Sequence, residues 1–101
     1  MQDYTIERVG RPDLLFDGDL IGRSAGDKPR IKIYRTKAGK FIGEMPGDDK
    51  RAKAEHFEKP AELVAWLRGG SNFLTEEAQA AVEDAVKNDA SFKSFWTERV
   101  E

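Results

Sequence analysis

The chain has 101 residues, of which 39% are hydrophobic and 36% charged, and its formal net charge at pH 7 is −2. This length fits one domain, and ten aromatic residues argue against a disordered chain. The absence of cysteine excludes disulfides and thiolate chemistry, and no apolar run approaches the ~20 residues that span a bilayer.

The first 58 residues are typical of β-strands. A weak alternation of apolar and polar residues over 4–9 precedes a turn signal at 10–13. Over residues 14–22 we expect one strand that bends or bulges at Gly18. The Asp-Gly pair in this segment also permits a tight hairpin, although each arm would then have only about three residues.

The clearest local pattern lies between residues 30 and 45. Its first half alternates, so Ile33 and Arg35 are expected on one face of the sheet and Tyr34 on the other. A turn around Gly39 then leads into a second run of β-forming residues. Together these features predict a β-hairpin.

The pattern changes from strands to helices near residue 59. A last strand is expected over 52–58. Pro60 suits the first position of a helix that ends at Gly69-Gly70, and Thr75 is a good N-cap for a second helix with a stripe of small apolar residues. A short third helix is expected to carry three aromatic residues, Phe92, Phe95 and Trp96.

Strands followed by helices, without βαβ alternation, indicate an α+β fold. We therefore expect a single domain over residues 1–101. An antiparallel meander of four to five strands, within residues 1–58, precedes two to three helices, within residues 59–101, that pack on one face of the sheet.

Positive charge is concentrated between residues 23 and 40, where seven residues are basic and one is acidic. One interpretation is a nucleic-acid surface with Tyr34 and Phe41 stacking on bases. The residues assigned to it are Lys28, Arg30, Lys32, Tyr34, Arg35, Lys37 and Lys40. The other interpretation is a solvated hairpin whose lysines discourage strand-to-strand association, and a pI near 5.5 favours it.

Catalytic and metal-binding patterns are not recognisable in the sequence. His56 is the only histidine, and we interpret it as a surface or structural residue, because a general base needs a positioned partner. Asp17 and Asp19 share a face of one strand, but this pair and Asp48-Asp49 supply too few ligands for calcium, and turn chemistry explains both. Phosphate-loop, dinucleotide and zinc patterns are missing. We therefore predict no catalytic residue, metal or cofactor, and an enzyme is not expected.

The aromatic residues of the last helix allow two interpretations. Phe92, Phe95 and Trp96 at helical spacing favour a core stripe that closes over the sheet. Alternatively, they form a partner-binding or dimer-forming face, because Trp and Phe are enriched in interface centres.

Several segments together show a family resemblance. They are Phe16-x-Gly18-x-Leu20-Ile21-Gly22, Tyr34-Arg35-Thr36-Lys37-x-Gly39-Lys40-Phe41-Ile42, Glu55-x-Phe57, Glu62-Leu63 and Leu67. With these motifs the chain resembles the EXLDI family of small bacterial proteins over roughly residues 4–80. Its ending, residues 97–101, does not carry the namesake motif. The resemblance implies the sheet-and-helix architecture and a bacterial origin, and it transfers no catalytic residue.

Three functions remain open. The leading hypothesis is a non-enzymatic protein-interaction module that can also self-associate. It is expected to be cytoplasmic, because the start of the chain shows neither a basic nor an apolar leader segment. The alternatives are nucleic-acid binding through residues 28–40 and a small-ligand or enzymatic pocket near His56 and Tyr34, between sheet and helices.

Overall fold

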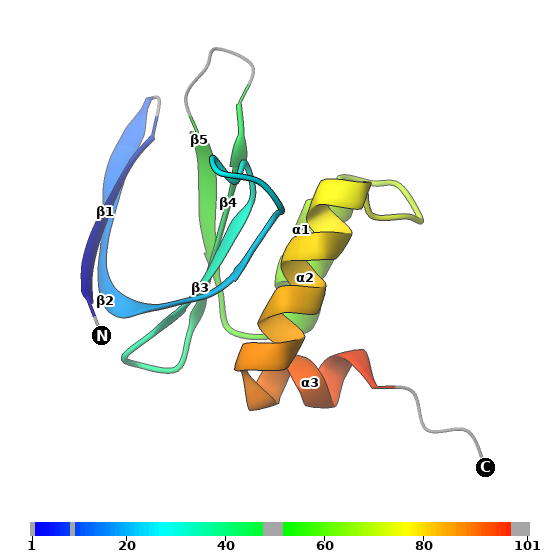
Figure 1. Cartoon of the computed structure of the whole chain (residues 1–101). Coiled ribbons are helices and arrows are strands. Elements are labelled where there is room, and N and C mark those ends of the chain that lie inside the picture. Colours follow the sequence, from blue (N-terminus) through cyan, green and yellow to red (C-terminus); the bar gives the residue numbers. More distant parts are fainter. Residues whose placement is uncertain (1, 9, 48–51, 98–101) are drawn as a thin grey trace.

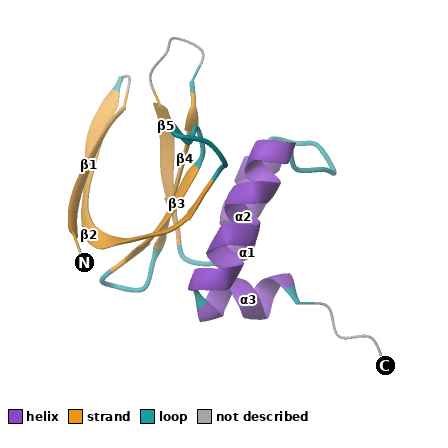
Figure 2. Cartoon of the chain, in the orientation of Figure 1, coloured by secondary structure: helices purple, strands orange, loops and turns teal. Residues whose placement is uncertain are grey.

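The computed structural model describes residues 2–8, 10–47 and 52–97. Five strands precede three helices (Figures 1 and 2): β1 (Gln2–Arg8), β2 (Arg11–Arg23), β3 (Lys32–Thr36), β4 (Phe41–Pro46), β5 (Ala52–Phe57), α1 (Pro60–Arg68), α2 (Glu76–Asn88) and α3 (Ala90–Trp96). All four strand pairs are antiparallel, and the strand order is β1-β2-β3-β4-β5. The predicted α+β meander is confirmed.

Strand β2 is one strand of 13 residues, as expected, and it gives the sheet its shape. The register slips between Leu20 and Gly22, so the irregularity lies later than the predicted Gly18. Residues 11–13, expected in a turn, instead open β2. The long strand bends, and Figure 1 shows it carrying β1 over one face of the other strands. The sheet therefore has an inner face beneath β1 and a helix face on the opposite side.

The inner face holds a small aromatic core. Tyr34 of β3 contacts Tyr4 of β1 and Phe16 of β2, with ring centroids 4.7 Å and 5.2 Å apart. The buried members of this core are Ile6, Tyr34, Ile42 and Ala54. Because these residues come from strands β1, β3, β4 and β5, burial of their apolar surface holds β1 against the rest of the sheet.

The helix face holds the larger core. Ile33 of β3, Leu63 of α1, Val82 of α2 and Phe92 of α3 are completely buried in it. The small-residue stripe of α2 packs directly on β2: a side chain at Gly22 would place its Cβ 2.8 Å from that of Ala85. This close approach explains why the strand has glycine opposite a helix lined with alanine.

The helices begin and end where local chemistry predicts. Gly69, with a φ of 59°, closes α1 in the left-handed region that glycine adopts without strain. The Thr75 side chain accepts a hydrogen bond from the Ala78 N–H and caps α2. Asp89 ends α2 and also caps α3, by accepting from the Phe92 N–H. Within the described residues, no helix is long and apolar enough to cross a membrane.

Candidate functional site

The basic residues assigned to nucleic-acid binding lie along β3 and in the segments on either side of it. Lys28 precedes β3, whereas Lys37 and Lys40 follow it, so these lysines lie at opposite ends of the strand. Arg30 forms an ion pair with Glu77 of α2 at 3.4 Å, and Arg35 contacts Asp89 at 2.7 Å. Two of the basic side chains therefore pair with carboxylates of the helical part of the chain.

The aromatic rings expected to stack on bases are inside the protein. Tyr34 is 4% exposed on the inner face, and Phe41 is 3% exposed on the helix face. Alternation along β3 places Arg35 on the opposite side of the sheet from Tyr34. Contrary to expectation, neither ring is available for stacking on a nucleic acid.

The aromatic stripe of α3 is divided by the fold. Phe92 is completely buried and lies edge-to-face against Phe41, with centroids 5.3 Å apart. Trp96 is half-buried against the same core, whereas Phe95 is 40% exposed. Phe92 is therefore a core residue and not part of an interface, and of the three only Phe95 is exposed.

The two residues assigned to a pocket between sheet and helices do not lie between them. Tyr34 is on the inner face, away from the helices, and His56 is exposed on β5. Among the described residues, no group of three His, Cys, Asp or Glu side chains is placed to hold a metal ion. Asp17 and Asp19 are exposed on β2, and Asp48-Asp49 lie outside the described residues.

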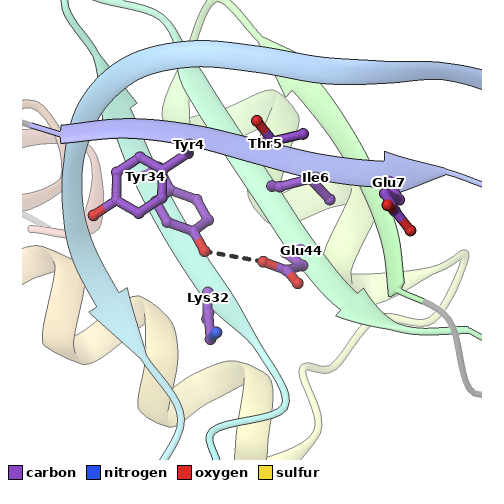
Figure 3. A pocket seen from close by; sticks show the side chains of 7 residues that line it. All are labelled: Tyr4, Thr5, Ile6, Glu7, Lys32, Tyr34 and Glu44. Atoms are coloured by element: carbon purple, nitrogen blue, oxygen red, sulfur yellow. Dashed lines mark hydrogen bonds between the residues drawn. The ribbon is translucent and has the colours of Figure 1, made fainter.

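A hollow of about 530 Å³ opens on the inner face between β1 and the strands β3 and β4 (Figure 3). Its volume is in the range of ligand-binding sites. The lining residues are Tyr4, Thr5, Ile6, Glu7, Lys32, Tyr34 and Glu44. Of these, Lys32 and Tyr34 were assigned to nucleic-acid binding from the sequence. Tyr34 was also placed near a small-ligand pocket, and the other five were not singled out as site residues.

Polar groups meet on the floor of the hollow. The Tyr34 hydroxyl donates a hydrogen bond to Glu44 Oε1 at 3.0 Å, and Lys32 lies opposite Glu44 in the β3–β4 register. Burial, and then the negative charge of Glu44, raise the pKa of Tyr34 well above its ordinary value. The hydroxyl therefore stays protonated at neutral pH, and the floor presents a carboxylate and an ammonium group side by side.

Strand β1 lines one side of the hollow. Four consecutive residues, Tyr4 to Glu7, line it, although successive side chains of a strand point to opposite faces. Such a run shows that β1 presents its edge to the hollow. In the described sheet β1 has a strand neighbour, β2, on one side only. We call its other side the β1 edge; alternate N–H and C=O groups of a strand point to such a side.

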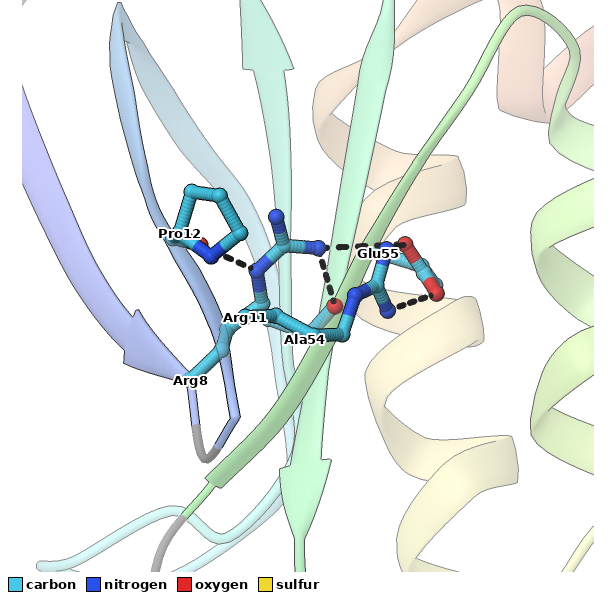
Figure 4. A network of polar contacts seen from close by, with 5 residues as sticks. All are labelled: Arg8, Arg11, Pro12, Ala54 and Glu55. Carbon is cyan, nitrogen blue, oxygen red and sulfur yellow. Dashed lines mark hydrogen bonds and ion pairs between the residues drawn. The ribbon is translucent and has the colours of Figure 1, made fainter.

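Two arginines, Arg8 and Arg11, hold the hairpin of β1 and β2, here called the β1–β2 arm, against β5 (Figure 4). We call their contacts with Glu55 the arginine clasp. Arg8 donates to the Pro12 carbonyl at 2.8 Å and reaches Glu55 of β5 at 3.3 Å and the Ala54 carbonyl at 3.5 Å. Arg11 forms a two-point contact with the same Glu55 carboxylate, and this hydrogen bonding lowers the pKa of Glu55. The clasp fixes the tip of the arm to β5, so the β1 edge stays above the hollow.

Comparison of this chain with protein-family models, with curated proteins and with solved structures found no match.

Proposed function

We propose that the chain is a protein-interaction module that binds an extended peptide segment of a partner protein along the β1 edge. The observation that carries this proposal is the hollow lined by four consecutive residues of an outermost strand. In strand addition, backbone hydrogen bonds supply affinity, and pockets for alternate side chains supply specificity. The β1 edge and the hollow beside it provide these two elements.

The sequence of β1 also favours this edge over that of β5. Proteins commonly protect edge strands with lysine or proline. Strand β1, Gln2–Arg8, contains neither residue, whereas β5 carries Lys53. Arg8 contacts the Ala54 carbonyl of β5, so the two edges are joined where β1 ends. Before this contact, the β1 edge carries neither of these protecting residues.

The inner face supplies a place for the side chains of the bound peptide. A residue that points inward from the new strand would lie beside Tyr4 and Ile6 and above Lys32 and Glu44. It would bury apolar surface against the first pair and reach polar groups on the second pair.

The resemblance to the EXLDI family and a cytoplasmic location stay predictions.

The proposal is tested by titrating the ¹⁵N-labelled protein with a neutral, end-capped hexapeptide that alternates Ser and Tyr. We expect shifted resonances and slowed amide exchange at residues 4–7 and shifts at Lys32 and Glu44. Lys32→Ala should weaken binding, whereas the control Lys53→Ala, on the β5 edge, should not. Shifts confined to the helices, or none at millimolar peptide, would contradict strand addition at β1.

A further inference from the structure

We infer that the partner segment alternates basic residues, which face away from the hollow, with tyrosine-like residues, which enter it. This inference rests on the proposed strand addition and specifies which peptides the β1 edge prefers. It follows from the two rows of side chains that β1 presents, one on each face of the sheet.

The outward row of β1 is acidic. Tyr4 and Ile6 point into the inner core, so alternation turns Asp3, Thr5 and Glu7 outward, where all three are exposed. On the neighbouring strand, Asp17 lies directly opposite Asp3.

Like charges directly opposite each other destabilise a strand pair, whereas opposite charges stabilise it. A strand added on the other side of β1 would place its own outward residues next to Asp3 and Glu7. Lys or Arg at these positions would complement both carboxylates and offset the repulsion between Asp3 and Asp17. The charge of the outward row therefore selects a basic segment.

The inward row faces a mixed surface. Tyr4, which is half-buried, offers part of its aromatic ring, and Lys32 and Glu44 offer an ammonium and a carboxylate group on the floor. Tyrosine combines an apolar ring with a hydroxyl at its tip, so the ring would pack on the aromatic wall while the hydroxyl reaches the floor. The hollow, at about 530 Å³, has room for such a side chain.

The test compares end-capped hexapeptides that alternate Lys with Tyr or Glu with Tyr, titrated into the labelled protein at low ionic strength. We expect the Lys peptide to bind about tenfold more tightly than the Glu peptide, because two cross-strand charge pairs change sign between them. In the double variant Asp3→Lys, Glu7→Lys the preference should reverse. The control Glu76→Lys, Glu83→Lys changes the net charge equally on exposed positions of α2 and should keep the preference.

The outcomes separate the two proposals. If both charged peptides bind at residues 4–7 with equal affinity, or if the Asp3→Lys, Glu7→Lys variant still prefers the Lys peptide, the charge pattern is wrong while strand addition stands. If neither these peptides nor the neutral Ser–Tyr peptide shifts the resonances of residues 4–7, strand addition fails and the inference fails with it.

Discussion

Asp89 joins three elements of the fold, and its replacement gives the sharpest test of how sheet and helices are held together. Its side chain is 2% exposed. It accepts a hydrogen bond from Arg35 Nη1 of β3 at 2.7 Å and another from the Phe92 N–H at 3.0 Å, while its backbone ends α2. Asp89→Ala removes both hydrogen bonds at once.

The expected cost follows from these two contacts. Loss of an N-cap side chain costs about 1 kcal/mol. A hydrogen bond to a charged group contributes about 1.5–3 kcal/mol, and the lower end applies because Arg35, 43% exposed, regains water. We therefore expect Asp89→Ala to lower the free energy of unfolding by about 2–4 kcal/mol. Asp89→Asn keeps an acceptor for the Phe92 N–H and should cost about half as much.

Urea unfolding followed by circular dichroism measures these differences, with Glu83→Ala as a control on the exposed side of α2. The double variant Arg35→Ala, Asp89→Ala should be more stable than the sum of the single costs implies, because the two residues share one contact. If Asp89→Ala costs no more than the control, or if the Arg35 and Asp89 effects simply add, the ion pair does not contribute as the structure indicates.

Three further predictions concern the core, the clasp and the closest helix contact. Phe92→Ala should cost about 3–5 kcal/mol in urea unfolding, whereas Phe95→Ala should cost under about 1 kcal/mol; equal costs would contradict the division of the stripe. The pKa of Glu55 is lowered in the folded protein, so its ionised carboxylate stabilises the fold. This stability is present at pH values above the pKa in the unfolded chain, about 4.3, and is lost as the pH falls through the lower pKa of the folded protein. Thermal unfolding between pH 6 and about pH 3 should therefore show a steeper acid loss in the wild type than in Glu55→Gln, and parallel curves would refute the clasp. Gly22→Ala should cost at least about 1–3 kcal/mol, because its Cβ meets helix backbone at Ala81; an unchanged urea midpoint would show that α2 moves freely.

Local chemistry made much of the fold predictable. The hairpin between residues 30 and 45, the end of α1 at Gly69 and the start of α2 after Thr75 depend on backbone preferences of a few neighbouring residues. The alternation around Tyr34 also predicted correctly that it lies on the opposite face from Ile33. Such features are readable because cause and effect lie within a few positions of each other.

The candidate site was decided by tertiary structure. Periodicity told which residues share a face, but not that β2 bends and carries β1 over Tyr34. The contacts that fix this arrangement join residues far apart in the chain, such as Arg11 with Glu55 and Arg35 with Asp89. The sequence by itself therefore determined the strands, the helices and their faces. Only the folded chain determined which edge lies above the hollow, because that depends on the bend of one long strand and on the distant side chains that hold it.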